Sequence, residues 1–183
     1  MTLPLWIFII LIPFYGLTEL AILAKNRTFF TPQKRDRITL GIVIPFTLVM
    51  VCAPLEYTQL HRAAADLTVW LGALIVAVGI AIRMKALIDL GSAFSMKVER
   101  KENQELVTGG LYATIRHPLY LATLVMALGI PILLSAWLTL FLTVLTTIGI
   151  LVRIRKEERF MREQFPGYEE YARKTWRLLP GIY

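Results

Sequence analysis

Long stretches of this sequence contain almost no charge, and they predict its architecture. Residues 3–23 are apolar apart from Glu19, and residues 38–55 carry no charge at all. A third apolar stretch covers residues 67–82 and continues through residues 86–88. A helix needs about 20 apolar residues to cross the ~30 Å hydrocarbon core of a bilayer, so each stretch predicts one transmembrane helix.

Three ionisable side chains lie near the ends of these stretches. Glu19 follows most of the first stretch, and Arg83 and Lys85 interrupt the end of the third. An ionisable group inside a span is a candidate functional residue by default. Because all three are near the membrane surface, we expect them to snorkel toward water.

The longest uncharged stretch, residues 119–152, is too long for a single crossing. Its 34 residues would form a helix of ~51 Å at about 1.5 Å per residue. Residues 129–131 (Gly-Ile-Pro) and Ser135 offer break points near its middle. Two arms of about 17 residues are at the short end of the spanning range. The pattern therefore predicts that the fourth and fifth transmembrane helices form a helical hairpin.

The basic residues predict which side of the membrane each connection occupies. With five spans, segments 24–37, 83–118 and 153–183 share one side and carry five, six and eight Lys or Arg, against Arg62 alone on the other. The positive-inside rule assigns the side with nineteen of the twenty cations to the cytoplasm, and the N-terminus to the opposite side. The first apolar block lacks a basic flank and a cleavage site, so we expect it to be retained.

Composition supports a membrane protein and limits the chemistry. The chain is 56% hydrophobic, above the roughly 45–50% apolar content of soluble domains. Its single cysteine, Cys52, cannot form an internal disulfide, and His61 and His117 lack the spacing of a metal site. The net charge of +7 is spread along the flanks of the spans. We therefore expect neither a metal ion nor a nucleic acid as a partner.

The predicted hairpin brings two polar segments together at its open end. Residues 116–118 (Arg-His-Pro) enter the fourth span, and Arg153 leaves the fifth. The fifth helix is expected to continue into water through Glu157 and Glu158. Taken singly, each of these residues also suits a membrane anchor or a solvated helix face. Together, a histidine, two arginines and two carboxylates can bind a zwitterion between opposite charges.

The C-terminal half carries these residues within an ordered set of motifs. In chain order they are Leu90-Gly91, Leu106-Val107-Thr108-x-Gly110-x-Tyr112, Arg116-His117-Pro118-x-Tyr120, Arg153, Glu157-Glu158, Phe165-x-Gly167, Tyr171 and Leu179-Pro180. This order resembles the isoprenylcysteine carboxyl methyltransferase family over roughly residues 88–181. The related phospholipid N-methyltransferases share the same C-terminal half.

The resemblance implies an all-α integral membrane enzyme with five transmembrane helices and a cofactor pocket at its cytoplasmic face. The cofactor would be S-adenosylmethionine, used without a Rossmann domain or a metal. Residues 67–183 would form the methyltransferase core, and residues 1–66 would add only the first two helices. Arg116 and Arg153 would position the carboxylate of the acceptor. The cofactor would be bound by Val107, Gly110, Tyr112, His117, Pro118, Tyr120, Glu157 and Glu158.

The resemblance leaves the methyl acceptor open. The main hypothesis is O-methylation of the carboxylate of an isoprenylcysteine-like or other lipidic acceptor, whose chain would enter sideways from the bilayer. A carboxylate is already nucleophilic, so the enzyme chiefly needs to align it. The alternatives are N-methylation of a phospholipid amine, S-methylation of a small thiol, or a membrane reductase or non-catalytic protein with a related fold.

Overall fold

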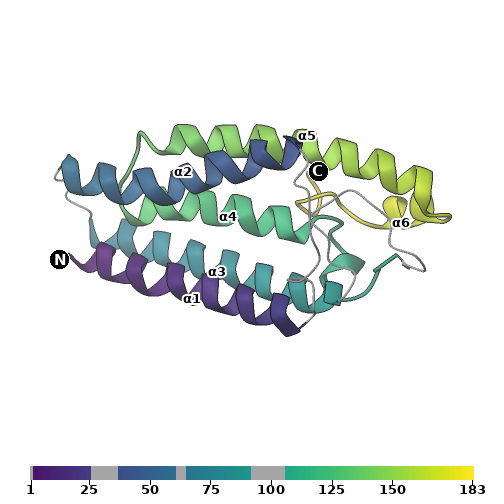
Figure 1. Ribbon diagram of the computed structural model, residues 1–183, viewed down its shortest axis with the longest axis horizontal. Coiled ribbons are helices and arrows are strands. Elements are labelled where there is room, and N and C mark those ends of the chain that lie inside the picture. Colours follow the sequence, from purple (N-terminus) through teal and green to yellow (C-terminus); the bar gives the residue numbers. More distant parts are fainter. Residues whose placement is uncertain (1, 26–36, 61–64, 92–105) are drawn as a thin grey trace.

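The computed structural model describes residues 2–25, 37–60, 65–91 and 106–183 as one helical bundle (Figure 1). His61, Arg62 and parts of the predicted connections 24–37 and 83–118 lie outside the described residues. In the described segments the chain is helical apart from turns and an isolated parallel bridge between Ile115 and Trp176. The helices are α1 (Leu3–Lys25), α2 (Arg37–Gln59), α3 (Asp66–Leu90), the 3-10 helix η3 (Gly110–Ala113), α4 (Pro118–Leu133), α5 (Leu140–Gln164) and α6 (Tyr168–Lys174).

Helices α1 to α3 match the first three predicted spans. The segments Leu3–Ile22, Leu40–Gln59 and Asp66–Leu90 are long and apolar enough to cross a membrane. We therefore describe the chain as an integral, multi-pass membrane protein. Helix α4 is apolar but has only 16 residues, which is ~24 Å at about 1.5 Å per residue. The assignment of α4 and α5 as spans four and five stays a prediction.

Helices α4 and α5 pack together and run in opposite directions, as the predicted hairpin requires (Figure 1). The predicted break at residues 129–131 is wrong, because α4 continues through Pro131 to Leu133. The chain turns at Ser135, the other predicted break point, whose φ is 49°. Proline deprives the carbonyl four residues earlier of its donor. That carbonyl, of Ala127, accepts a 2.6 Å hydrogen bond from the Thr143 hydroxyl of α5, so the helix tolerates the proline.

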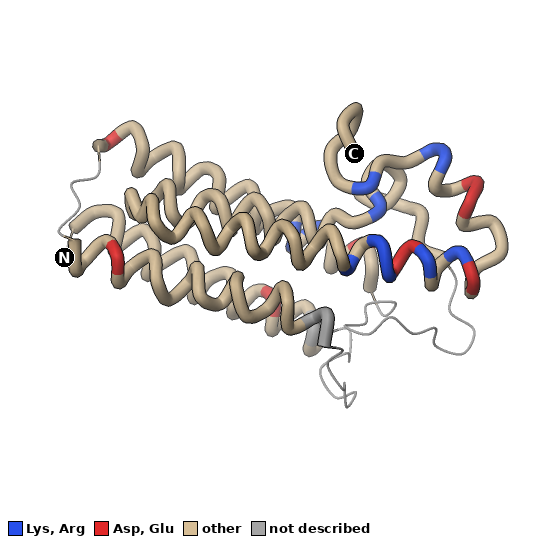
Figure 2. The backbone as a smooth tube through the Cα atoms, turned by 90° about the horizontal axis from the view of Figure 1, so that it is seen from above, with Lys and Arg blue, Asp and Glu red and all other residues tan. Residues whose placement is uncertain are grey.

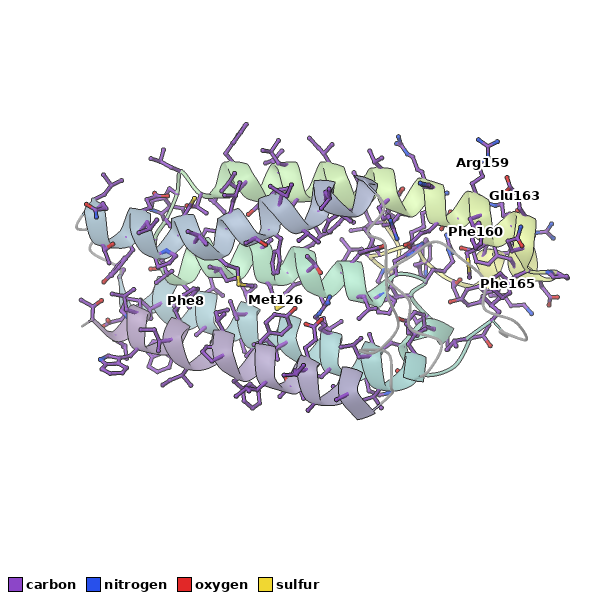
Figure 3. All side chains as sticks on the ribbon, viewed as in Figure 1. Phe8, Met126, Arg159, Phe160, Glu163 and Phe165 are labelled. Carbon is purple, nitrogen blue, oxygen red and sulfur yellow. The ribbon has the colours of Figure 1, made fainter. Side chains whose placement is uncertain are left out.

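The centre of the bundle is the close contact between α3 and α4. Gly129 of α4 faces Val76 of α3 so closely that a Cβ atom would collide with the α3 backbone. Gly72 of α3 likewise faces the backbone of Leu133. Met126 is fully buried between these helices (Figure 3). Small residues permit this close approach of helices, which explains Gly129 better than a helix break does.

Helix α2 packs against α5 and caps it. The carboxylate of Glu56 accepts hydrogen bonds from Leu138 N at 3.0 Å and Thr139 N at 2.8 Å. It also accepts one from the Thr139 hydroxyl at 2.9 Å. The first N–H groups of a helix have no intrahelical acceptor and carry a partial positive charge. A carboxylate accepts their hydrogen bonds and also balances that charge. Glu56 therefore fixes the direction in which α5 starts toward the opposite end of the bundle.

Glu19 of α1 and Arg83 of α3 form an ion pair inside the bundle. Arg83 Nε lies 2.9 Å from Glu19 Oε2, and Nη2 lies 2.7 Å from Oε1. Each side chain is only 16% exposed. The expectation that both snorkel to the surface is wrong, because each side chain satisfies the other between the helices. Lys85 is exposed and pairs instead with Asp89 on the same helix.

Charged residues are distributed unevenly along the bundle (Figure 2). In the described part of the chain, Lys and Arg gather toward the end that holds α6 and the end of α5. The opposite end carries the acidic residues Glu56 and Asp66. This separation agrees with the predicted grouping of cations, and it places the polar half of α5 beyond the apolar bundle.

Candidate functional site

The chain approaches α4 through a turn that is held by α3. The backbone N–H of Leu111 in η3 donates a 2.8 Å hydrogen bond to the carboxylate of Asp89. Gly110 has a φ of 61°, and a Cβ atom there would collide with that carboxylate. Only glycine adopts this conformation without cost. Gly110, a predicted site residue, is therefore required by the turn that positions the next residues.

The next segment pairs with residues near the end of the chain. Arg116 N donates to Trp176 O at 2.7 Å, and His117 N donates to Arg177 O at 3.1 Å. Pro118 then occupies the first turn of α4, where its missing N–H has no intrahelical partner to lose. These constraints fix the backbone at residues 116–118 and direct the Arg116 and His117 side chains toward α5.

The facing side of α5 presents three of the predicted residues. Arg153 and Glu157 are one helical turn apart, and Glu158 follows directly. Arg153 is 2% exposed and Glu158 is 1% exposed, which is unusual for charged residues on the polar half of a helix. Arg159 and Glu163 point away from the bundle on the outer side of the same helix (Figure 3). Helix α5 thus has one solvated face and one face that builds the site.

Glu157 connects α5 to the first turn of α4. Its Oε1 accepts a 2.8 Å hydrogen bond from Arg153 Nε and a 2.7 Å hydrogen bond from the Tyr120 hydroxyl. Its Oε2 lies 3.7 Å from His117 Nδ1, and the side chain is 22% exposed. Glu157 is therefore held in place through Oε1, while its side chain as a whole remains partly exposed.

Glu158 is surrounded by positive charge. Its Oε1 lies 2.9 Å from Arg116 Nε and 3.6 Å from His117 Nε2. Its Oε2 lies 2.9 Å from Arg177 Nε and 3.5 Å from Arg162 Nη2. Burial by itself raises the pKa of Glu158, but His117 and Arg116 outweigh it and lower the pKa to about 2. Glu158 is therefore ionised throughout the physiological range.

His117 lies between the two glutamates with part of its hydrogen-bonding capacity unused. Its ring stacks on Tyr120 with the centroids 5.7 Å apart. Its Nε2 atom is buried and has no hydrogen-bond partner among the described residues. Buried polar atoms are almost always paired, so an unpaired one needs an explanation. A bound ligand with a polar group at this position would supply one.

Tyr112 and Val107 are the predicted site residues in the segment that precedes α4. Tyr112 is buried, and its carbonyl accepts a 2.7 Å hydrogen bond from the Tyr171 hydroxyl. Burial raises the pKa of the Tyr112 phenol well above its usual value. Val107 is half-buried in the segment before the glycine turn. It is not part of the hydrogen-bonded group around the glutamates, so its predicted contact with a cofactor stays a prediction.

The structure brings together most of the residues predicted from sequence. Arg116, His117, Tyr120, Arg153 and the glutamate pair form one contiguous group, with Pro118 setting the start of α4. Sequence reasoning missed Arg177 and Thr175, which contact this group from the end of the chain. The only nearby sequence signal is the Leu-Pro pair at residues 179–180, which carries no charge and does not indicate Arg177. No cluster of three or more metal-ligating side chains occurs among the described residues.

Comparisons with known proteins match the same region. The model of the isoprenylcysteine carboxyl methyltransferase (ICMT) family matches residues 70–163. A probable protein-S-isoprenylcysteine O-methyltransferase of Oryza sativa subsp. indica is 33% identical over 117 residues, covering 62% of this chain and 61% of the relative. The cobalt-zinc-cadmium resistance protein CzcN of Cupriavidus metallidurans is 34% identical over 89 residues, covering 48% of this chain and 41% of that protein.

A solved structure shows the same arrangement of helices. The eukaryotic intramembrane Ras methyltransferase ICMT (isoprenylcysteine carboxyl methyltransferase) matches with a TM-score of 0.62 and 26% identity. The match covers 75% of this chain and 52% of the solved chain. This chain therefore spans about half of the solved protein and 61% of the rice relative.

Proposed function

The chain belongs to the isoprenylcysteine carboxyl methyltransferase family, and we propose that it is an S-adenosylmethionine-dependent membrane methyltransferase. We further propose that it esterifies the carboxylate of an isoprenylcysteine-like or other lipidic acceptor. The observation that carries the proposal is the convergence of His117, Arg153 and Glu157 where α4 enters and α5 leaves the apolar bundle. A lipid-soluble acceptor with a charged head would meet these residues there.

The residues of the site suit the polar parts of S-adenosylmethionine. His117 offers a buried nitrogen that makes no hydrogen bond among the described residues, and Glu157 offers a carboxylate whose side chain is partly exposed. A carboxylate and an imidazole can bind an amino group, a ribose hydroxyl or a carboxylate. We assign Glu157 and His117 as direct contacts, and Tyr112, Pro118 and Tyr120 as residues that shape the pocket. When bound, the cofactor supplies a methyl group on a positively charged sulfur.

Arg153 is placed to position an acceptor carboxylate. It directly follows the uncharged stretch of α5 that ends at Val152, at the boundary between the apolar and the polar halves of the helix. A planar guanidinium grips a carboxylate at two points, and methyl transfer depends mainly on such alignment. The second arginine predicted for this role, Arg116, donates to Glu158 and to the carbonyl oxygens of Ala172 and Thr175. Its contact with the acceptor stays a proposal beside this structural function.

The membrane arrangement of the proposed enzyme follows from the distribution of apolar and charged residues. Large apolar side chains such as Trp70, Phe14 and Phe141 are exposed on the outside of the bundle. We propose that α4 and α5 complete five spans and that the site faces the cytoplasm, because the basic residues gather at its end of the bundle. We also propose that residues 67–183 form the methyltransferase core, with residues 1–66 contributing the first two transmembrane helices.

Calorimetric titration of the protein in detergent with S-adenosylhomocysteine tests the cofactor assignment. We expect saturable binding to the wild-type protein. Glu157→Gln and His117→Ala should weaken it by about tenfold or more, the loss expected for one hydrogen bond to a charged group. Glu163→Gln, on the solvated face of α5, serves as the matched control and should bind like the wild type. Failure of folded wild-type protein to bind would contradict the proposed function.

The acceptor is tested by the chemistry of the product. Membrane lipid extracts and a prenylated cysteine analogue would each be incubated with the protein and methyl-labelled cofactor. A methyl ester releases its label in mild base, whereas N-methyl and S-methyl products retain it. We expect base-labile label and its loss in Arg153→Ala. Base-stable label would instead support an amine or thiol acceptor.

A further inference from the structure

The end of the chain forms part of the candidate site through its backbone. Residues 175–183, which we call the C-terminal segment, lie beyond the range matched by the family model. Trp176 N donates to Thr114 O at 2.9 Å, and Trp176 O accepts from Arg116 N at 2.7 Å. The Arg177 carbonyl accepts from His117 N. The backbone of residues 114–117 is therefore fixed by the C-terminal segment rather than by another helix.

Apolar contacts anchor the same segment to the bundle. Leu178 is buried in a cluster with Leu121 of α4 and with Ile150 and Ile154 of α5. The chain then folds back, because Leu178 N donates to Tyr183 O at 2.8 Å. The C-terminal segment thus contacts both arms of the hairpin and is held between them.

Arg177 extends from this anchored segment to Glu158. Its Nε lies 2.9 Å from Glu158 Oε2, and the Tyr183 ring covers its guanidinium with 5.0 Å between the guanidinium carbon and the ring centroid. Arg116 holds the other oxygen of Glu158 and reaches the C-terminal segment through the Thr175 hydroxyl at 3.2 Å. The two arginines therefore hold the carboxylate from opposite oxygens.

This arrangement separates the functions of the paired glutamates. Both oxygens of Glu158 have an arginine nitrogen within 2.9 Å, and the side chain is 1% exposed. Glu157 keeps its Oε2 beside His117 and is 22% exposed. A ligand can approach Glu157, whereas approach to Glu158 requires breaking an ion pair.

We propose that Arg177 is a positioning residue of the cofactor site, acting through Glu158. Together they hold residues 116–117 against α5, so that the His117 ring stands between the glutamates. The proposal rests on the proposed function and adds a residue that lies outside the family match. It assigns Arg177 no contact with cofactor or acceptor, so loss of Arg177 should weaken cofactor binding without changing the chemistry of the product.

The test compares S-adenosylhomocysteine affinity in three single variants. Arg177→Ala should weaken binding by about tenfold, the loss expected for one charge-assisted hydrogen bond. Arg177→Lys, which keeps the charge, should recover part of the affinity. Lys174→Ala removes a cation three residues earlier whose partner is the exposed Glu170, and it should leave affinity unchanged. Equal affinity in Arg177→Ala and the wild type would overturn the proposal.

A double-mutant cycle separates positioning from a general structural effect. If Arg177 acts through Glu158, Arg177→Ala should cause less than about a twofold further loss in a Glu158→Gln background. An undiminished loss in that background would overturn the proposal. If Arg177→Ala does not fold, the cycle is run with Arg177→Lys and read in the same way. Absence of binding to the folded wild type would contradict the proposed function itself, which keeps the two failures distinct.

Discussion

The hydroxyl of Tyr120 donates a 2.7 Å hydrogen bond to Oε1 of Glu157, and this bond joins the first turn of α4 to the polar half of α5. The same oxygen accepts from Arg153. Arg153, the proposed contact of the acceptor, and Glu157, the proposed contact of the cofactor, are therefore fixed relative to each other through one carboxylate oxygen. The geometry makes Tyr120 a link between the two halves of the site, although it carries no charge.

Removal of this hydroxyl should impair catalysis with little effect on the fold. We expect Tyr120→Phe to lower kcat/KM by about tenfold, because a hydrogen bond to a charged group contributes about 1.5–3 kcal/mol. Tyr57→Phe is the matched control, since its hydroxyl bonds Thr2 at the opposite end of the bundle. Steady-state methylation assays on both variants check the prediction. Equal losses in the two would show that the effect is not specific to the site.

The paired glutamates should respond differently to the same substitution. Glu158→Gln leaves the nearby arginines without their buried counter-charge, and we expect it to lower the free energy of unfolding by about 3–5 kcal/mol. Glu157→Gln keeps a partly exposed side chain whose amide oxygen can still accept from Arg153 and Tyr120, so it should cost clearly less stability than Glu158→Gln while it reduces cofactor affinity. Denaturant titration in detergent micelles measures the first effect and calorimetry the second. Similar losses of stability in both variants would contradict the division of functions.

The low pKa of Glu158 predicts how stability changes with acid. Burial by itself raises this pKa. His117 and Arg116 lower it by more than burial raises it, so the pKa falls from 4.5 to about 2. Because the pKa is lower in the folded than in the unfolded state, the contribution is complete above pH 4.5 and is lost as pH falls toward 2. The difference in unfolding free energy between wild type and Glu158→Gln should therefore shrink over this window. A constant difference would show that the carboxylate is not stabilised by its neighbours.

Much of this architecture could be predicted because it depends on simple constraints of length and charge. An uncharged stretch too long for one crossing required a turn, and the turn brought residues 116–118 to Arg153. Of the two predicted break points, Ser135 is where the chain turns, whereas residues 129–131 lie inside α4. Pro131 remains inside α4 because Thr143, on the other arm, satisfies the carbonyl that proline leaves free. From sequence alone, proline is interpreted as a helix breaker, because the sequence does not show that another helix supplies the missing hydrogen-bond donor.

The candidate site could likewise be predicted only in part, because some of its contacts join segments that are distant in sequence. Most of the residues that motif order identified lie together in the structure. Arg177 was missed because its importance arises from backbone pairing between Ile115 and Trp176. These residues are far apart in sequence, and no periodic pattern indicates a single bridge. The ion pair between Glu19 and Arg83 was missed because the two residues are also far apart in sequence. Considered alone, each side chain is expected to snorkel to the membrane surface.

The Glu19–Arg83 pair provides a test of helix packing away from the candidate site. Both side chains are 16% exposed and form a two-point contact, so Glu19→Leu leaves Arg83 without its counter-charge. We expect that single change to lower the unfolding free energy by about 3–5 kcal/mol. The double variant Glu19→Leu/Arg83→Met removes both charges and should recover most of the loss, because apolar residues of similar size often replace a buried pair at no cost.

The exposed pair between Lys85 and Asp89 is the control for this prediction. Lys85→Met should change stability by less than about 1 kcal/mol, since solvent screens such pairs. Denaturant titration in micelles compares all three variants. If the double variant were as unstable as Glu19→Leu, charge neutralisation would not explain the pair, and the Arg83 hydrogen bond to Thr123 of α4 would be the contact that stabilises this part of the bundle. Recovery in the double variant would instead show that the pair joins α1 to α3 chiefly by cancelling two buried charges.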